Sequence, residues 1–448
     1  MLLLLLLAAA ISVVAAVPEA VLRQDDRGLE FSLPHVPGTR KVHFDYVVEL
    51  RKGESKHRTG TASRQENESS WRWRDEKVKL NNGDKVLYKV SLWIGKDKYE
   101  GSLQSWKYEP LPTLGPRRTR AVVFRDDFNG ANLDRNHWKY EVSMFGGMNW
   151  EFQVYTPEHA NVFLQGGHLF LKPTLTINDP RFNENFLTTG TMDMTALWGV
   201  CTNSGNYGCT REGRNGMLPP IMSGKVTTIP TIRFGQVEVR ARIPVGDWIW
   251  PAIWMMPRDS VYGTWPRSGE IDIMESRGNL NARDGGGNHG VNEVSSTLHW
   301  GTAWDHNNYG LTHGEVRKSS GGFQGDFHTW KLDWTHDHIV TSVDGQEVLR
   351  VTPPGGGFTE LGHVSGSPWP GNSKMAPFDQ DFFLILNVAV GGTNGYFPDG
   401  WNYGVAKPWP NNSPHANADF WSKRNQWEST WHGNNAAMEI DYIELRSL

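Results

Sequence analysis

Three acidic residues lie within one short stretch that otherwise alternates like a β-strand. Residues 269–276 have the sequence GEIDIMES, with carboxylates at Glu270, Asp272 and Glu275. In a regular strand, side chains two residues apart share a face, so Glu270 and Asp272 project together while Ile271 points into a core. Glu275 falls on the core side of this register, where a carboxylate is costly.

One extra residue in the strand removes this conflict. Such a β-bulge re-aims the side chains after it. We therefore predict a bulge at Ile273-Met274, which brings all three acids onto one concave face. Two carboxyl groups that are close enough to act on the same bond are the groups that glycosidases use to cleave a glycosidic bond. Acidic residues also alternate on the solvated face of ordinary edge strands, so the pattern gains weight only from its surroundings.

The composition favours an all-β protein with an aromatic-lined groove. The chain has 448 residues, which is enough for two domains and a sizeable core. Its net charge is -4 with 21% charged residues, so neither nucleic acid nor an anionic membrane is an expected partner. It contains 48 Gly and 25 Pro, which indicate many turns, and 21 Trp, which supply many flat apolar rings.

The N-terminus predicts export. Residues 1–16 resemble a signal peptide, because the apolar run is too short to span a membrane comfortably and ends in small residues, although a basic start is missing. We expect the mature protein to be soluble, secreted and monomeric. In an oxidising compartment, Cys201 and Cys209 are expected to pair as a local disulfide. Zinc is disfavoured because histidines are absent from their neighbourhood.

The chain divides into two β-rich parts. Alternating apolar residues at 42–48 and 86–94 predict strands with one wet face, so residues 17–107 are expected to form a smaller immunoglobulin-like β-sandwich. The polar stretch 51–70 between them carries no comparable pattern. Residues 108–120 are rich in proline and arginine and are typical of a linker.

Residues 121–448 predict one large antiparallel sandwich or jelly roll. Strand patterns recur to the C-terminus, with clear examples at residues 167–172, 237–243, 381–390 and 438–445. The loops between them are full of Gly, Asn and Pro. We find no internal repeat that would indicate a propeller or a solenoid.

A dense run of indoles precedes the three acids. Residues 246–257 include three tryptophans, Trp248, Trp250 and Trp254. Trp rings stack on the partly apolar faces of sugars. Carboxylates beside such rings indicate a polysaccharide cleft, whereas simple core packing is the alternative for either Trp.

Residues 250–257 and 269–276 together resemble the signature of glycoside hydrolase family 16, in its β-1,3-glucanase (laminarinase) branch. Further resemblance to this family lies at residues 124–128, 149–156, 386–392 and 439–442. Residues 198–213 are similar to a cysteine-clipped loop of invertebrate β-1,3-glucan recognition and binding proteins. Residues 28–34 and 83–88 resemble the small glucan-binding module that precedes the glucanase-like domain in those proteins. The resemblance implies a jelly-roll glucanase domain behind a β-glucan-binding sandwich.

The resemblance also implies roles for the acids. Glu270 is the expected nucleophile, Glu275 the general acid and then base, and Asp272 the neighbour that holds and tunes them. In a retaining glycosidase the two working carboxyl groups lie about 5 to 5.5 Å apart. Like charges at close range cannot all ionise, so one pKa is pushed upward. We expect net retention, and no cofactor is required.

Five further residues are expected to contact the substrate: Asn149, Trp250, Trp254, Lys225 and His299. Lys225 stands where relatives usually carry Arg, and lysine cannot make the same two-pronged contact. His299 could hydrogen-bond sugar or carboxylate, or be a satisfied buried histidine. Trp334 and Asn387 also match family motifs and are equally well explained as scaffold.

Three functions remain open at this stage. The first is a secreted endo-β-1,3-glucanase, favoured by the intact acids. The second is an innate-immune recognition protein that binds microbial β-1,3-glucan without cleaving it. The third is a glucan transglycosylase. A metal ion among the acids is disfavoured because it would quench the nucleophile. A structural calcium elsewhere in the domain, as in many relatives, stays possible, and the sequence does not identify its ligands.

Overall fold

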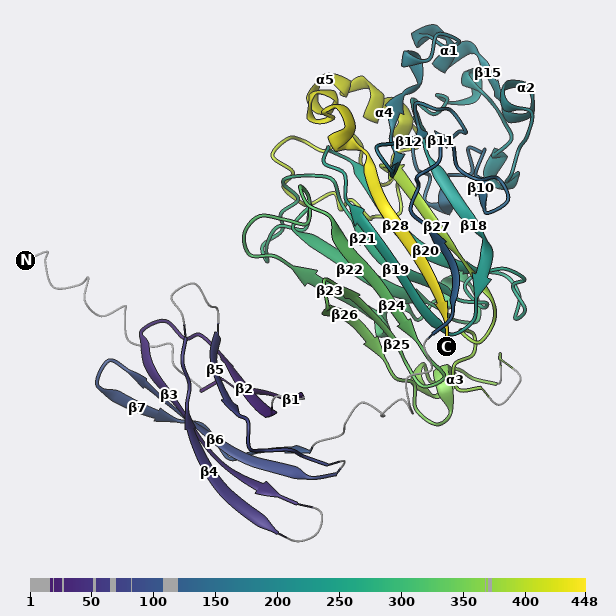
Figure 1. The fold of residues 1–448 in the computed structure, drawn as a ribbon. Helices are drawn as coiled ribbons and strands as arrows, with labels where there is room; N and C mark the ends of the chain where they lie inside the picture. The colour runs from purple at the N-terminus through teal and green to yellow at the C-terminus, as the bar shows by residue number, and fades with distance from the viewer. Residues whose placement is uncertain are drawn as a thin grey trace, which may run out of the picture. The chain divides into compact units, whose positions relative to one another are not determined.

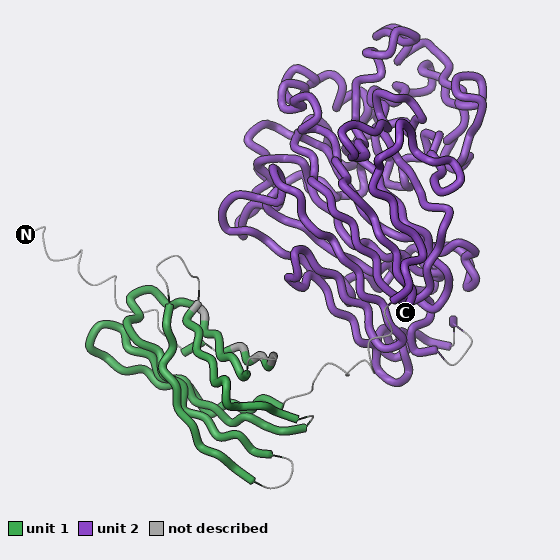
Figure 2. Tube along the Cα trace, viewed as in Figure 1, with its two compact units in different colours: residues 1–117 green, residues 118–448 purple. Residues whose placement is uncertain are grey.

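The computed structural model describes residues 17–18, 20–25, 28–50, 54–64, 70–81, 83–107, 120–366, 368–369 and 373–448. The chain forms two compact units, residues 1–117 and 118–448 (Figures 1 and 2). The predicted signal peptide and residues 108–119 of the predicted linker lie outside the described residues. The exact domain limits therefore stay predictions.

Unit 1 is a sandwich of two antiparallel sheets. One sheet has the order β1-β2-β5, and the other has the order β4-β3-β6-β7 with β8 also paired to β6. The strands are β1 Val21–Asp25, β2 Gly28–Pro34, β3 Thr39–Glu49, β4 Ser55–Thr61, β5 Ser70–Asp75, β6 Lys85–Ile94, β7 Asp97–Glu100 and β8 Gln104–Lys107. Between the sheets, the Phe31 ring lies 4.9 Å from Phe44 and 4.7 Å from Tyr46, centroid to centroid.

β4 is among the strands of unit 1 that were not predicted from the sequence. β4 forms within the polar stretch 51–70, where no apolar alternation predicts it. It pairs along β3 from His43 opposite Thr61 to Glu49 opposite Ser55. Most of its side chains remain exposed. This strand therefore forms through backbone hydrogen bonds at the edge of the sheet. Such bonds do not require an alternation of apolar residues in the sequence.

Unit 2 is built from two large sheets that enclose its core. The first has the order β10-β18-β27-β20-β21-β22-β23, and the second has the order β12-β13-β28-β19-β24-β25-β26 with β9 paired to β28. All pairs in both sheets are antiparallel. The all-β jelly-roll architecture is confirmed.

The bounds in the first sheet are β10 Trp138–Tyr140, β18 Lys225–Ile232, β27 Phe382–Val390, β20 Ile249–Pro257, β21 Glu270–Ser276, β22 Glu293–His299 and β23 His313–Arg317. Those in the second are β9 Val122–Asp126, β12 Val162–Gln165, β13 His168–Leu171, β19 Gly235–Arg242, β24 His328–Trp334, β25 Ile339–Val343, β26 Gln346–Val351 and β28 Met438–Ser447.

Shorter elements fill the connections. Small sheets comprise β11 Gln153–Tyr155, β17 Ile221–Ser223 and β14 Thr174–Leu175, and β15 Thr191–Asp193 with β16 Thr210–Glu212. The α-helices are α1 Glu184–Thr189, α2 Met194–Trp198, α3 Gly357–Leu361, α4 Ala416–Ser422 and α5 Arg424–Trp427. Short 3-10 helices lie at Gly146–Met148, Thr176–Asn178, Gly205–Tyr207, Gly213–Asn215, Trp304–His306, Tyr309–Leu311, Glu428–Thr430 and Gly433–Ala436. In the described part of the chain, no helix has the length and apolar character that a membrane crossing requires.

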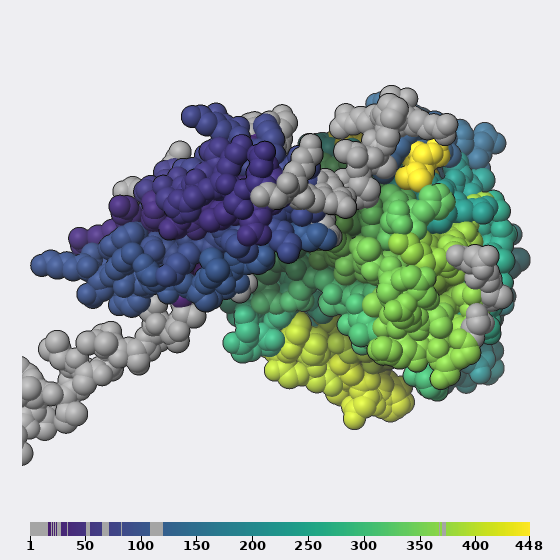
Figure 3. Space-filling model, turned by 90° about the horizontal axis from the view of Figure 1, so that it is seen from below, coloured from purple at the N-terminus to yellow at the C-terminus, as the bar shows by residue number. Residues whose placement is uncertain are grey.

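Aromatic side chains close the end of unit 2 that carries α3. Phe358 of α3 is buried, and its ring lies 4.9 Å from both Trp300 and Phe378. Figure 3 views the molecule from this end, where the green, later part of the chain forms much of the visible surface of the unit. Trp334 belongs to the core and donates its indole N–H to the Phe378 carbonyl at 3.0 Å. The structure thus assigns Trp334 to the scaffold.

The predicted disulfide is present. Cys201 and Cys209 are bonded, with their Cα atoms 5.5 Å apart. The clipped loop is fastened to the rest of the unit by the Met144 amide, which donates to the Gly208 carbonyl at 2.8 Å. The loop therefore has two independent anchors.

We expect the double variant Cys201→Ser/Cys209→Ser to loosen this loop while the two large sheets remain folded. Closing so short a loop is worth about 2.5 kcal/mol in the chain-entropy model. Limited proteolysis followed by mass spectrometry should show cleavage within residues 202–208 that is at least tenfold faster than in the wild type. Val200→Ala, just outside the disulfide, is the control, and equal cleavage rates in all three proteins would contradict the expectation.

Candidate active site

The register of β21 contains the predicted bulge. On the β20 side, Met274 pairs with Ile253 whereas Asp272 pairs with the next residue along, Trp254. The pairing with β22 also shifts between Asp272 and Glu275. Ile273 is thus an extra residue, and both it and Met274 are buried in the core. The bulge at Ile273-Met274 is confirmed.

The bulge gathers the predicted residues on one face of the first sheet. Cross-strand partners in a sheet point to the same side. Glu270 pairs with His299 on β22, and Glu275 pairs with Ala252 on β20. Ala252 lies between Trp250 and Trp254, which share its face because they are two residues away. The three acids, both tryptophans and His299 therefore line a single surface.

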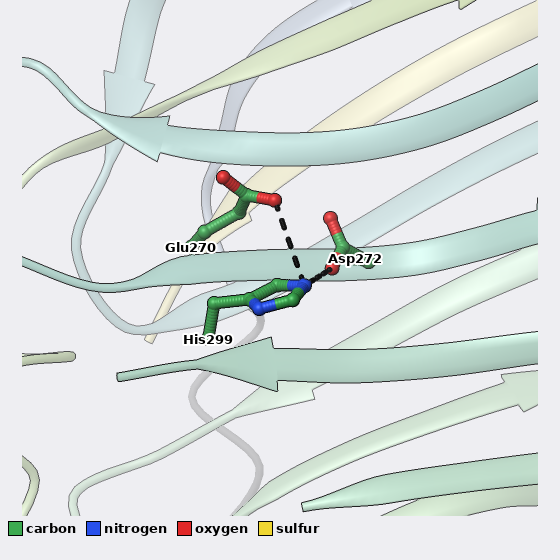
Figure 4. A group of neighbouring side chains, drawn as sticks. All are labelled: Glu270, Asp272 and His299. Atoms are coloured by element: carbon green, nitrogen blue, oxygen red, sulfur yellow. Dashed lines mark ion pairs between the residues drawn. The ribbon is translucent and has the colours of Figure 1, made fainter. Parts of the chain in front are cut away.

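His299 links two of the acids. Its Nε2 lies 3.2 Å from Oδ2 of Asp272 and 3.9 Å from Oε1 of Glu270 (Figure 4). The other ring nitrogen, Nδ1, lies 2.8 Å from the Asn307 side-chain amide. Figure 4 shows both carboxylates rising from β21 and the imidazole reaching them from β22. Both ends of the ring are engaged, so its orientation is fixed.

The acids hold the imidazole in its charged form. Burial alone would lower the pKa of His299, but the contact with Asp272 and the charges of Glu270 and Glu275 outweigh it and raise this pKa to about 9. At neutral pH the ring is therefore a cation. It balances part of the negative charge that the three carboxyl groups bring to the site.

Burial keeps two of the acids from ionising freely. Asp272 is only 3% exposed, and burial followed by the charge of Glu270 raises its pKa well above the usual range. The pKa of Glu275 is also raised, first by burial, although the His299 charge and a hydrogen bond from Trp250 oppose this rise. A protonated carboxyl group at position 275 can act as a general acid.

Each of the two working acids receives an indole hydrogen bond. Trp265 Nε1 donates to Oε2 of Glu270 at 2.9 Å, and Trp250 Nε1 donates to Oε1 of Glu275 at 2.9 Å. These bonds fix the carboxyl groups and leave their second oxygens for other partners. Trp265 lies in the loop before β21 and was not predicted from the sequence. An indole five residues before Glu270 was the available signal.

Trp250 is packed more tightly than a sugar platform requires. It is 7% exposed, and its ring stacks on Tyr396 with centroids 3.8 Å apart. Behind Tyr396, the Arg277 guanidinium lies 4.2 Å from the same ring. Tyr396 and Arg277 were missed because their loop contacts follow no sequence period. The contacts of Trp250 support a role in positioning Glu275, and its role in binding sugar stays a prediction.

Two more of the predicted substrate contacts, Trp254 and Lys225, lie farther across the sheet. Trp254 donates to Oδ1 of Asn387 at 2.6 Å, and Asn387 donates to the Tyr155 hydroxyl at 2.9 Å. The Lys225 ammonium lies 5.1 Å from the Trp254 ring and 5.6 Å from the Tyr155 ring. Lys225 thus supplies a point charge over two rings. Asn387 acts as a bridge between these side chains.

Asn149 lies in the loop before β11. Its side chain donates to Oε1 of Glu151 at 3.0 Å and accepts from Asn394 at 3.0 Å. Its backbone carbonyl accepts from the Thr393 amide at 2.8 Å. Asn149 therefore ties its own loop to the one after β27, and a sugar contact from this residue stays a prediction.

Two of the acids and His299 are also close enough to share a cation. Within the part of the chain that the structure describes, ligand atoms of Glu270, Asp272 and His299 lie within 4.8 Å of one another. A metal ligand must be a neutral imidazole, so a cation here would have to displace the proton that the raised pKa of His299 favours. Calcium also prefers oxygen ligands throughout. The group fits a proton-sharing cluster better than a metal site, and a structural calcium elsewhere stays a prediction.

Known proteins resemble both parts of the chain. A model of glycosyl hydrolases family 16 matches residues 200–381, and one of a carbohydrate binding domain (family 32) matches residues 20–125. The β-1,3-glucan-binding protein of Penaeus monodon is 45% identical over 343 residues, which cover 72% of this chain and 89% of that protein. Glucan endo-1,3-β-glucosidase A1 of Niallia circulans is 32% identical over 290 residues, or 60% of this chain and 34% of that protein.

A solved laminarinase from Rhodothermus marinus is 24% identical and covers 73% of this chain and 97% of its own, with a TM-score of 0.46. The sequence matches define a glycosidase-type domain that comes after a carbohydrate-binding module. The chain belongs to glycosyl hydrolase family 16, among relatives named β-1,3-glucan-binding proteins.

An NMR titration of the histidine rings tests the electrostatics of the site without any substrate. We expect the His299 ring to titrate with a midpoint near pH 9 in the wild type. Asp272→Asn removes the carboxylate nearest to Nε2, so the midpoint should fall. Asp305→Asn removes an exposed carboxylate that contacts His306, and it should leave the His299 midpoint unchanged. A wild-type midpoint near 6.5 would show that the acids do not hold this ring as a cation.

Proposed function

We propose that this chain is a secreted endo-β-1,3-glucanase that works with retention of configuration. The observation that supports it most is the bulge in β21, which puts Glu275 on the same face as Glu270. Each of these acids has its own indole donor. Glu275 also has the raised pKa that a general acid requires.

In the proposed first step, an oxygen of ionised Glu270 attacks the anomeric carbon and forms a glycosyl ester. The bond between that carbon and the bridging oxygen breaks, and the bridging oxygen takes the proton of Glu275. In the second step, ionised Glu275 takes a proton from water. The water oxygen then attacks the same carbon and releases Glu270, so two inversions give net retention.

His299 and Asp272 support these changes of charge. The His299 cation faces both Glu270 and Asp272, so it stabilises the ionised nucleophile. The same cation lies 3.2 Å from Asp272, and this contact opposes the rise in the pKa of Asp272 that burial and the charge of Glu270 cause. Once Glu270 becomes an ester, its charge is gone, and Glu275 can lose its proton against less repulsion. The cluster thus favours the alternation of acid and base that the mechanism requires.

Relatives support β-1,3-glucan as the substrate. The names of the Penaeus monodon and Niallia circulans proteins both refer to this polymer. The match of residues 20–125 to a carbohydrate-binding domain supports a tether for the same polysaccharide. Two linked weak sites raise the local concentration of substrate. Secretion is proposed from the N-terminal sequence and agrees with the disulfide.

A second candidate is glucan recognition without cleavage, as in an innate-immune receptor. It is favoured by the name of the relative that is 45% identical, which describes binding alone. Glucan transglycosylation is a third, because the glycosyl ester can be resolved by a sugar instead of water. The intact pair of acids favours chemistry over recognition.

Incubation with laminarin distinguishes the candidates. Wild-type protein should produce a ladder of short oligosaccharides, and proton NMR of the first products should show the β-anomer. Glu275→Gln should lower kcat by about 10²- to 10⁴-fold, which is the usual contribution of a general acid. Glu270→Gln should abolish turnover because no ester can form.

Each other result has a definite meaning. An inverted first product, or a Glu270→Gln variant that keeps most of its activity, would remove the proposed mechanism. Binding of laminarin by the wild type with no cleavage would favour recognition, and lengthened chains would favour transglycosylation. The fold of each variant is checked by its thermal unfolding before its activity is compared.

The Trp265 indole provides a separate prediction. Trp265→Phe keeps an aromatic ring but deletes the hydrogen bond to Glu270. A hydrogen bond to a charged group is worth about 1.5 to 3 kcal/mol, so kcat/KM on laminarin should fall by about 10- to 100-fold. Trp304→Phe, an exposed tryptophan replaced in the same way, is the control. A Trp265→Phe enzyme as active as this control would show that the indole does not position the nucleophile.

A further inference from the structure

Unit 2 contains a cavity that none of the three acids of β21 lines. Its volume is about 970 Å³, which is large enough for several sugar units. Its walls come from residues 150–152, 210–212, 215–217 and 413–418, with Tyr207 and Thr393. The cysteine-clipped loop therefore contributes one wall, and the loop before β11 contributes another.

Two exposed aromatic rings face this cavity. Trp150 is 54% exposed and Tyr207 is 77% exposed, and both belong to its lining. Single exposed aromatic residues need no explanation, but two on one cavity form a surface on which flat sugar rings can stack. The tip of each side chain can also hydrogen-bond a hydroxyl group.

The backbone holds both rings at a cost. Trp150 has φ 54° and Tyr207 has φ 59°, which place two bulky residues in the left-handed region. Such conformations cost of order 1 to 3 kcal/mol each and gather at functional sites. Asn206, directly before Tyr207, and Met148, two residues before Trp150, are left-handed as well. The fold thus maintains an unfavourable backbone on both sides of the same cavity.

The wall that carries Tyr207 is fastened firmly. The Cys201–Cys209 disulfide closes the loop, and the Arg211 guanidinium donates to the backbone carbonyls of Met144 and Asn206. These contacts fix the backbone that carries the Tyr207 ring in advance of any ligand. A rigid aromatic side chain loses little conformational entropy on binding.

The polar lining suits an uncharged, hydroxyl-rich ligand. Thr393, Asn215 and His415 are among the lining residues. The carboxylate of Glu212 is paired with Arg214 at 2.7 Å, and Arg211 is engaged with backbone carbonyls. Glu151, the other carboxylate of the lining, accepts hydrogen bonds from the side chains of Asn149 and Gln153. These three charged side chains are therefore each engaged by protein partners.

The cavity is connected to the active site by one loop. The Thr393 amide donates to the carbonyl of Asn149, the neighbour of Trp150. Three residues farther along the same loop, Tyr396 stacks on Trp250, whose indole donates to Glu275. The same short segment therefore supports both the cavity wall and the general acid.

We infer that this cavity is a distal subsite that binds glucosyl units of a β-1,3-glucan chain away from the bond being cut. This inference rests on the proposed function. Trp150 and Tyr207 stack on sugar rings of the chain, and the loop that contains Thr393 leads from them to the catalytic acids. Long chains occupy both places at once, whereas short oligosaccharides reach only the acids. The enzyme should accordingly prefer long chains.

Hydrogen–deuterium exchange on full-length Glu275→Gln tests where glucan lies. With laminariheptaose, peptides from β20 and β21 and peptides from residues 205–217 should both exchange more slowly. With laminaritriose, only the β20 and β21 peptides should be protected. Peptides from unit 1 report separately on the carbohydrate-binding module, so its binding is not mistaken for occupancy of either site.

The ratio of kcat/KM for laminariheptaose to that for laminaritriose tests the rings directly. We expect Trp150→Ala and Tyr207→Ala each to lower this ratio by about tenfold, a typical loss for one stacking ring. Tyr207→Phe keeps the ring and should retain most of the preference. Val200→Ala, exposed beside the same loop but outside the cavity lining, should leave the ratio unchanged.

The outcomes separate this inference from the proposed function. Protection of β20 and β21 with none at residues 205–217 overturns the distal subsite and leaves the hydrolase proposal standing. Equal protection of residues 205–217 by both oligosaccharides indicates an independent site and overturns the link to the acids. Unchanged ratios in both alanine variants also overturn it. Absence of protection throughout unit 2 contradicts both proposals.

Discussion

The geometry of the site depends on one extra residue in β21. Without Ile273 in the bulge, Glu275 would point into the core among buried apolar side chains, where a carboxylate costs several kcal/mol. With it, Ile273 and Met274 both enter the core and Glu275 joins Glu270 on the open face. The core packing that stabilises the sheet therefore also sets the position of Glu275.

This arrangement brings three carboxyl groups close together, and the surrounding contacts reduce the repulsion between their charges. A single cation, His299, faces two of them, and two indoles hold the acids at 270 and 275. Burial raises the pKa of Asp272 and of Glu275, whereas the His299 cation opposes both rises. Burial and the close spacing of the charges thus give chemically similar carboxyl groups different pKa values.

Features with a regular sequence period were predictable, whereas features that depend on tertiary contact were not. The bulge was predictable because Glu275 broke a strict alternation of two. β4 was missed because an exposed edge strand has no apolar period. Trp250 was predicted as a sugar platform, but the sequence could not reveal its stack on Tyr396. The indole of Trp265 comes from a loop whose path no local pattern specifies.

The central claim is that Glu270 forms a covalent bond with the sugar. A laminaribiosyl fluoride with fluorine at C2 tests it, because this fluorine slows both steps while the fluoride leaving group speeds the first, so the ester accumulates. Mass spectrometry of the digested protein should find one added glycosyl group on the peptide that contains Glu270. An active wild-type enzyme that acquires no adduct, or acquires it on another residue, would contradict the account.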